Sequence, residues 1–400
     1  MNKWPTSKIS DVCTKIAMGP FGSNIKVDNF VPTGVPVLNG ANLTGFKLKE
    51  DSFNYVTERK AEELKNSLAY RGDIVVTHRG TLGQLVYIPS GSKFDKYLIS
   101  QSQFLVRVNP DKADSRFVTY FFHSPYGQYL LLSNASQVGV PALARPTSTF
   151  KSLEIPLPPL RIQRKIADML CLLDNKIELN AQINQNLEAQ LFAFFKYFYG
   201  KASSNKSFLN NYCSFQEGYV NPSQSKPEYF DGPIKWLRAV DINESYIIAT
   251  SRTLTQKGFL SAGKSALLFP PDSIAISKSG TIGRLGLIAN EMCGNRAVIN
   301  IVPMKLEWLG YIYCYLKSRQ AEFHDLAVGS VQNNLYVSVL ALLEIKTPEE
   351  KTWSVFHCFA QHILNKIKNN CLESQQLSQL RDTLLPKLMS GEIDVSEVEV

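Results

Sequence analysis

The chain of 400 residues contains the same arrangement of segments twice. Residues 74–85 match residues 274–285 without a gap, at an offset of 200. A second ordered match follows at an offset of 190, between residues 154–177 and residues 344–367. Because two such matches in the same order are improbable by chance, we predict a duplication in which the second copy has lost about ten residues.

Each copy begins with about 150 residues of short β-type runs separated by turn residues, and ends in a long helical pattern. In the first copy a proline-rich hinge at 155–159 precedes the helix. This order predicts two globular domains, two helices and a short acidic tail. The predicted boundaries are 1–159 and 201–348 for the domains, 160–200 and 349–390 for the helices, and 391–400 for the tail.

Both helical stretches carry a heptad pattern, in which seam positions recur with 4,3 spacing. The seam is apolar at its two ends and polar in its middle, where Asn180 and Asn370 occupy the same place in the two copies. A buried Asn at such a position fixes the register of paired helices at some cost in stability. The seam positions predicted to pack are Ile166, Leu170, Leu173, Ile177, Asn180, Leu187, Ile363, Ile367, Asn370 and Leu377.

Two helices of about 35–40 residues would each be about 55 Å long, and each has a stripe that must be covered. We predict that they pack on each other as an antiparallel coiled coil. The fold class is then α+β, with two globular α/β domains of similar fold, each followed by a long helix, and pseudo-two-fold symmetry. The alternative is that each helix covers only its own domain.

The basic excess of the chain is concentrated in the two predicted domains. The net charge is +8 for the whole chain, of which residues 1–159 contribute +6 and residues 201–348 contribute +4. Residues 160–200 carry +1 and residues 349–400 carry −3. A basic excess found on both copies of a duplicated unit favours a nucleic-acid partner.

Several classes of protein are excluded by the sequence. No window of about 18 uncharged apolar residues occurs, so no membrane span is expected, and the first residues lack the apolar core of a signal peptide. The seven cysteines are scattered, and no pair is spaced C-x-x-C. This predicts reduced thiols in a cytoplasmic protein, with neither disulfides nor a zinc site.

Residues 258–265 have the spacing of a Walker A phosphate-binding loop. Such a loop needs a buried strand before it and a helix beginning at its lysine, whereas a polar stretch precedes it here and Pro270-Pro271 follows. We therefore interpret the match as coincidence. A standalone DNA endonuclease or NTPase that uses this stretch is the alternative function, and a scaffold whose two domains bind proteins is a third.

No catalytic or metal-binding constellation is predicted. Glu344-Ile345-Lys346 is similar to the tail of a metal-dependent nuclease motif, but it lacks a Pro-Asp at the usual distance upstream. None of the five histidines belongs to an H-E-x-x-H motif. His357 and His362 are five residues apart, a spacing that does not place two ligands well on one helix face.

Polar loops next to strands are the remaining candidates for function. Residues 77–81 and 277–281 offer hydrogen-bond donors at one repeated place. Their glycines and threonines agree, as a hairpin turn alone would also require, whereas His78-Arg79 and Lys278-Ser279 differ. Such differences are what two readers of unlike DNA sequences need, because Arg, Lys, Asn and Gln bond base edges and hydroxyls bond phosphates. The predicted DNA-binding residues are Ser23, Asn24, Lys26, His78, Arg79, Thr81, Gln137, Arg238, Lys278, Ser279, Thr281, Arg284, Gln332, Asn333 and Asn334.

Taken in order, these features resemble the specificity subunit of type I restriction-modification enzymes. The features are the Gly-Pro-Phe-Gly-Ser loop at 19–23, the glycine turns at 80–83 and 280–283, the hinge at 155–159 and the closing segment 384–393. Each motif alone is moderately specific, but their order is highly specific. The resemblance covers nearly the whole chain.

The resemblance implies two target-recognition domains, each reading one half of a bipartite asymmetric site in double-stranded DNA. It also implies that the helices set the spacer between the halves and dock two modification (methyltransferase) subunits. Restriction subunits, which translocate DNA with ATP, can join this complex. On this view the chain is not itself an enzyme. It holds no cofactor, and S-adenosylmethionine, ATP and Mg are expected on the partner subunits.

The second copy departs from the family pattern at two places. Residues 216–220 stand where the Pro-Phe-Gly loop would be, and the second hinge at 345–348 has fewer prolines. The reading residues of the second domain are therefore less well defined by the resemblance than those of the first.

Overall fold

The computed structural model describes residues 4–136, 139–202, 206–329, 333–347 and 350–398. The chain divides into two compact units, Met1–Asn175 with Ser378–Val400 (unit 1) and Lys176–Leu377 (unit 2). The boundaries between these units lie inside the two long helices, whereas the predicted domains end where the helices begin. Apolar residues near both ends of each helix enter the cores of the globular parts, so each helix contributes to both units.

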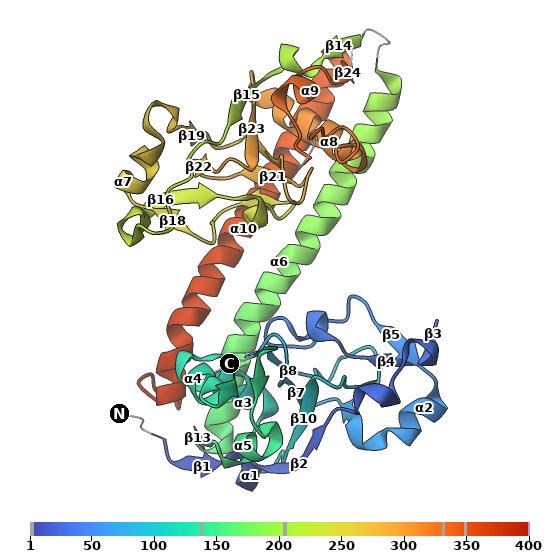
Figure 1. The fold of residues 1–400 in the computed structure, drawn as a ribbon, viewed down its shortest axis with the longest axis vertical. Coiled ribbons are helices and arrows are strands. Elements are labelled where there is room, and N and C mark those ends of the chain that lie inside the picture. The colour runs from blue at the N-terminus through green and yellow to red at the C-terminus, as the bar shows by residue number, and fades with distance from the viewer. Residues whose placement is uncertain (1–3, 137–138, 203–205, 330–332, 348–349, 399–400) are drawn as a thin grey trace. The chain divides into compact units, whose positions relative to one another are not determined.

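Unit 1 is built on an antiparallel four-stranded sheet in the order β2-β10-β7-β8 (Figure 1). Its strands are β2 (Cys13–Met18), β10 (Gln103–Val108), β7 (Ile74–Thr77) and β8 (Leu85–Tyr87). Alternation along β7 decides which core each side chain joins, because successive residues of a strand face opposite sides. Ile74 and Val76 pack with the helices of the unit, while Val75 packs toward a second sheet.

The second sheet of unit 1 has the order β3-β5-β4-β9-β6. Its strands are β3 (Phe30–Val31), β5 (Asn54–Val56), β4 (Val35–Val37), β9 (Lys96–Leu98) and β6 (Leu68–Tyr70). Two short pairs complete the strands of the unit: β1 (Thr6–Lys8) with β13 (Glu154–Pro156), and β11 (Ala135–Ser136) with β12 (Ala142–Leu143). The short helices are α1 (Ile9–Val12), α2 (Glu58–Glu63), α3 (Ser115–His123), α4 (Pro125–Leu132) and α5 (Pro146–Ser152).

Unit 2 repeats this plan (Figure 1). Its main sheet has the order β15-β23-β20-β21-β17, formed by β15 (Cys213–Glu217), β23 (Val298–Pro303), β20 (Ile274–Ser277), β21 (Leu285–Ile288) and β17 (Tyr246–Ile247). The second sheet, β18-β16-β22-β19, consists of β18 (Thr253–Leu254), β16 (Phe230–Leu237), β22 (Met292–Gly294) and β19 (Leu268–Phe269). β14 (Lys206–Phe208) pairs with β24 (Glu344–Lys346), and the short helices are α7 (Gln256–Phe259), α8 (Leu309–Ser318) and α9 (Val337–Ala341).

The predicted duplication is confirmed element by element. β7 and β8 match β20 and β21 at an offset of 200, and the order β2-β10-β7-β8 recurs as β15-β23-β20-β21. Alternation recurs as well, since Ile274 and Ile276 join one core of unit 2 and Ala275 joins the other. The predicted α+β class with two similar domains, each followed by a long helix, is correct.

The long helices are α6 (Leu160–Lys201) and α10 (Glu350–Ser390). In unit 2 they run antiparallel: Phe194 stacks on Phe356, and the Asn180 amide donates to the Ser374 hydroxyl. Most predicted seam residues are buried, while Leu173, Ile177, Leu187 and Leu377 are half-buried. The fully covered seam residues are Ile166, Leu170, Asn180, Ile363, Ile367 and Asn370.

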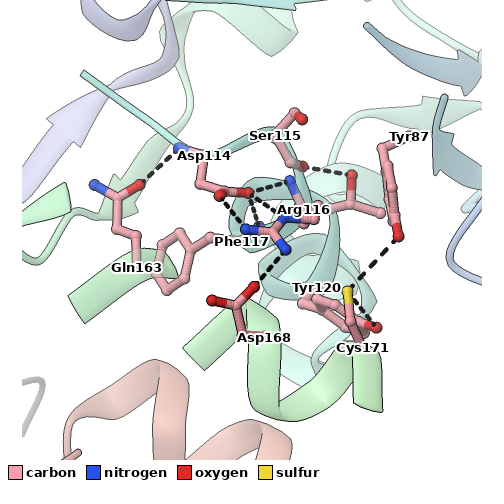
Figure 2. A network of polar contacts seen from close by, with 10 residues as sticks. Tyr87, Asp114, Ser115, Arg116, Phe117, Tyr120, Gln163, Asp168 and Cys171 are labelled. Carbon is pink, nitrogen blue, oxygen red and sulfur yellow. Dashed lines mark hydrogen bonds and ion pairs between the residues drawn. The ribbon is translucent and has the colours of Figure 1, made fainter. Parts of the chain in front are cut away.

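A polar network joins α3 to the first turns of α6 in unit 1 (Figure 2). Asp114 caps α3 by accepting from the backbone N–H of Arg116 at 2.8 Å, and its carboxylate also binds the Arg116 guanidinium. Figure 2 shows that guanidinium reaching on to Asp168 of α6. The two carboxylates raise the pKa of Arg116 above its usual range. The domain and its helix are thereby held by charge as well as by apolar packing.

The closing segment after α10 belongs to unit 1. Val395 is fully buried in the unit 1 core, and the Lys165 ammonium donates to the backbone carbonyl of Ser396 at 2.6 Å. The predicted acidic tail therefore packs on the unit through its apolar residues. None of the helices in the described part of the chain is long and apolar enough to cross a membrane.

Candidate nucleic-acid interface

In unit 1 the hairpin loop 78–84 between β7 and β8 is held on both sides by backbone hydrogen bonds. The His78 N–H donates to the Ser102 carbonyl at 2.9 Å, and the Leu143 N–H donates to the His78 carbonyl at 2.8 Å. Gly80 lies at φ +95°, in the left-handed region that favours glycine. The turn thus presents Arg79 and Thr81, both exposed, from a fixed backbone.

Four segments meet at this end of the unit 1 sheet, and together they form what we call the unit 1 loop face: residues 19–24, 78–84, 100–103 and 139–146. Backbone hydrogen bonds link them, among them Gly19 N–H to Gln103 O at 2.8 Å and Gly80 N–H to Pro141 O at 2.9 Å. None of the four segments contains Asp or Glu, whereas Arg79 and Arg145 are both exposed. A face with cations and amides but no carboxylates suits a polyanion.

His78 is the least exposed of the predicted residues in this loop. Its Nε2 lies 3.0 Å from the Gln101 carbonyl oxygen. Partial burial lowers the pKa of His78, so the ring is neutral near pH 7 and Nε2–H donates to that carbonyl. His78 therefore links two segments of the loop face, and Arg79 beside it carries the charge.

Unit 2 has the corresponding hairpin loop, 278–284, between β20 and β21. The Lys278 N–H donates to the Ala297 carbonyl at 2.8 Å, and the Leu335 N–H donates to the Lys278 carbonyl at 2.9 Å. These bonds are the counterparts of those at His78. Inside the turn the Ser277 hydroxyl donates to the Thr281 carbonyl and accepts from the Arg284 N–H. Thr281 and Arg284 are exposed and Ser279 is half-buried.

Two predicted DNA-binding residues of unit 2 already bond to other side chains of this protein. The Lys278 ammonium pairs with Glu217 at 2.8 Å, with both side chains largely covered. Arg238 donates to the Ser251 hydroxyl and lies 3.6 Å from Asp241. Lys278 can reach a base only after it leaves Glu217, so Arg284 and Arg296, both exposed, are the more accessible cations.

The other predicted residues lie in different settings. Asn24 is exposed on the loop face, Lys26 is exposed two residues after it, and Asn333 is exposed. Asn334 is half-buried and pairs its backbone with Val328. Ser23 lies in a single 3₁₀ turn, Gly22–Asn24, and its side chain is outside the described part of the structure, as are Gln137 and Gln332.

Reasoning from the repeats missed Arg145, which adopts φ +47° and ψ +57° just before Pro146. A left-handed conformation is unfavourable for an Arg, and residues in such strained conformations cluster at functional sites. Arg145 lies three residues after Ala142, which bridges to Arg79. The segment lies outside both matched blocks, but the lack of acidic residues around it was a signal that could have found it.

The structure provides no phosphate-binding loop at residues 258–265. Helix α7 ends at Phe259, and the six residues Leu260–Ser265 form a kinked 3₁₀ segment, with Gly263 at φ +58° and ψ −130°. The chain is extended after Ser265, so no helix begins at Lys264. The interpretation of this motif as coincidental is correct.

Metal and thiol chemistry find no support among the described residues. No group of three or more His, Cys, Asp or Glu side chains is placed to hold a metal ion there. All seven cysteines are free thiols. Burial raises the pKa of Cys213 and of Cys293 to about 12, which keeps both thiols protonated and unreactive.

Comparison with known proteins decides the family. The model of the type I restriction modification DNA specificity domain matches residues 1–189 and again residues 206–374, one match for each copy. The chain belongs to this family. The resemblance inferred from the sequence motifs is thus confirmed, and the alternative of a standalone nuclease or NTPase gains no support.

Two specificity subunits illustrate the relationship. The Type I restriction enzyme HindI specificity subunit of Haemophilus influenzae is 24% identical over 411 residues, which covers 81% of this chain and 87% of that protein. The MjaIX specificity subunit of Methanocaldococcus jannaschii is 24% identical over 432 residues, covering 99% and 94%. Among solved structures, the S subunit of a type I restriction-modification system from M. genitalium matches with a TM-score of 0.59 at 16% identity, covering 97% of this chain and 96% of that one. This last likeness concerns the fold.

Proposed function

We propose that the two units read the two halves of a bipartite, asymmetric site in double-stranded DNA, and that the chain is the non-catalytic specificity subunit of a methyltransferase and endonuclease complex. The observation that carries this proposal is the pair of corresponding loops at 78–84 and 278–284. Both are held by the same backbone bonds, but they present different side chains. One scaffold with unlike readers is what an asymmetric site requires.

Direct readout in the major groove is the mechanism that these loops favour. Arg79 and Arg284 are exposed on fixed turns, and an Arg can donate two hydrogen bonds to the O6 and N7 of a guanine. The neighbouring hydroxyls and backbone N–H groups suit phosphate oxygens, which position the protein without reading sequence. Two units in one chain make the second contact effectively intramolecular.

The long helices are proposed to set the spacer between the half-sites and to dock two modification subunits. In support of this role, α6 and α10 each contribute residues to both units. Exposed apolar side chains on α6, Leu172 and Leu179, are available for a partner. S-adenosylmethionine, ATP and Mg belong to the partner subunits in this proposal, and restriction subunits are further partners.

Mapping methylated adenines in cells with and without this chain tests the proposal. We expect methylation at two unlike half-sites separated by a spacer of fixed length, and its loss when the chain is deleted. An unchanged map would contradict the proposal. Metal-dependent cleavage or nucleotide binding by the isolated chain would favour the standalone enzyme instead.

A further inference from the structure

Phe21 is 83% exposed, the largest value among the large hydrophobic side chains that the structure describes. It lies in the loop after β2 and belongs to the unit 1 loop face, next to a buried Pro20. An aromatic ring left in water forfeits the burial that normally stabilises it. Its position leaves the ring available to a partner outside this chain.

The loop that carries Phe21 is fixed rather than free. Gly19 packs so closely on the Ser100 carbonyl that a Cβ would not fit, and its N–H bonds to Gln103 O. On the other side of Phe21, the Asn24 N–H donates to the Phe21 carbonyl at 2.8 Å. Gly19 thus lies on the turn formed by residues 100–103. His78 bonds to the same turn, at the Gln101 carbonyl. The ring is thus presented beside the hairpin that carries Arg79.

Unit 2 has an exposed aromatic in the corresponding loop, one residue nearer to its glycine than Phe21 is to Gly19, although its loop sequence differs. Gly218 follows β15 as Gly19 follows β2, and it packs on the Asn295 carbonyl so that no Cβ would fit there either. Its N–H donates to the Val298 carbonyl at 3.0 Å. The next residue, Tyr219, is 47% exposed and donates its hydroxyl hydrogen to Glu217 at 2.7 Å.

We propose that Phe21 and Tyr219 each press their ring against a DNA base in the half-site that their unit reads. This inference rests on the proposed function. DNA is favoured over a protein partner because the unit 1 loop face has cations and no carboxylates, and because the aromatic recurs in both units. Aromatic rings stack on bases, and apolar side chains inserted between base pairs unstack and kink a duplex.

The test uses the full chain with its modification subunits and duplexes that carry the methylated site, with 2-aminopurine replacing one adenine at a time. With wild type, we expect fluorescence to rise at one position in each half-site. A ring inserted beside a 2-aminopurine separates it from the neighbouring base, and a 2-aminopurine unstacked from its neighbour is brighter. Phe21→Ala should abolish the rise in the first half only, and Tyr219→Ala in the second half only. From the strength of base–aromatic stacking, each variant should bind about 5- to 150-fold more weakly.

Matched variants separate ring contact from folding. Phe21→Trp should keep binding and the fluorescence rise, since it keeps a ring. Tyr70 and Phe208 are also exposed aromatics, 40% and 44%, but they lie in β6 and β14, outside the loops that carry Phe21 and Tyr219, so Tyr70→Ala and Phe208→Ala should bind like wild type. The melting temperature of each variant provides the check on folding.

Two results would overturn the inference. In the first, Phe21→Ala and Tyr219→Ala bind within twofold of wild type and wild type brightens no position, while Arg79→Ala still weakens binding. In the second, Phe21→Ala loses the modification subunits on gel filtration, which would make the partner a protein. A wild-type complex that binds no specific DNA at all would instead contradict the proposed function.

Discussion

Arg381 of α10 and Asp174 of α6 form an ion pair in unit 1, with Nη1 and Oδ1 2.7 Å apart and each side chain only 16% exposed. The Arg381 guanidinium also lies over the Phe46 ring, 4.6 Å from its centroid. At the positions that the offset of 190 equates with this pair, unit 2 has Leu364 and Leu191, both buried. The two copies thus have an ion pair at one of these places and two residues of the apolar core at the equivalent one.

This equivalence predicts the effect of replacing the pair. Arg381→Leu alone leaves the Asp174 carboxylate covered and without its cation, and should lower the free energy of unfolding by about 3 kcal/mol. The double variant Asp174→Leu, Arg381→Leu should recover part of that loss, because two leucines suit the corresponding place in unit 2, although the Tyr120 hydroxyl then loses its acceptor on Asp174. Urea unfolding measures both. A single variant as stable as wild type, or a double variant less stable than the single, would contradict the expectation.

Arg79 is expected to read a base of the first half-site. Arg79→Ala should weaken binding to the target duplex by about 1–3 kcal/mol and relax the preference at one position, if its guanidinium bonds a base. A phosphate contact would instead weaken binding to all sequences alike and reduce the salt slope by about 1. Titrations of target and scrambled duplexes over a salt series distinguish the two, and equal binding by wild type and variant refutes the assignment.

His123 predicts a pH dependence of the stability of unit 1. Its ring packs on Phe46, and its Nε2 lies 2.8 Å from the Leu85 carbonyl. Burial lowers the pKa of His123, the nearby Arg381 lowers it further, and the Leu85 carbonyl and Asp174 act in the opposite sense. The unfolded chain therefore binds a proton more readily than the folded one, so the contribution of the neutral ring is present above about pH 6.5 and is lost as the pH falls.

The measurement for His123 is the melting temperature between pH 7.5 and pH 5. Wild type should lose stability over this interval, and His123→Gln should lose less, because its amide can donate to Leu85 without titrating. His78→Gln is the matched control, since His78 is also held neutral by burial but less completely covered. Parallel curves for wild type and His123→Gln would show that His123 does not cause the dependence.

The sequence predicted the repeated parts of the molecule well and the long-range pairings poorly. The 200 offset located both hairpins with their glycine turns, and the heptad identified Asn180 and Asn370, which are both buried. Arg381 continues the 4,3 spacing four residues beyond Leu377, but nothing local indicates that Asp174, some 200 residues earlier, covers its charge. Likewise Lys278 is a natural reader by type, yet it pairs with Glu217, 61 residues upstream. Such pairings depend on tertiary packing, which periodicity does not reveal.

If the helices set the spacer, lengthening them should change the recognised site. The test is to insert one heptad after Asn175 and one after Leu377. Both insertions fall on the boundary between the units and leave the contacts inside each unit intact. Seven residues add about 10 Å and turn the helix face by only about 20°. The methylated site should then gain up to about three base pairs of spacer at 3.4 Å each. A functional variant that methylates the original spacing would reject the ruler.

The central claim is that each unit reads its own half-site, and the adenine-methylation map of two point variants tests it most directly. Cells carrying Arg79→Ala should show relaxed sequence preference in one half-site with the other unchanged, and cells carrying Arg284→Ala should show the converse at the same spacer length. If both variants relax the same half-site, or if each alters both halves, the assignment of one half-site to each unit is wrong.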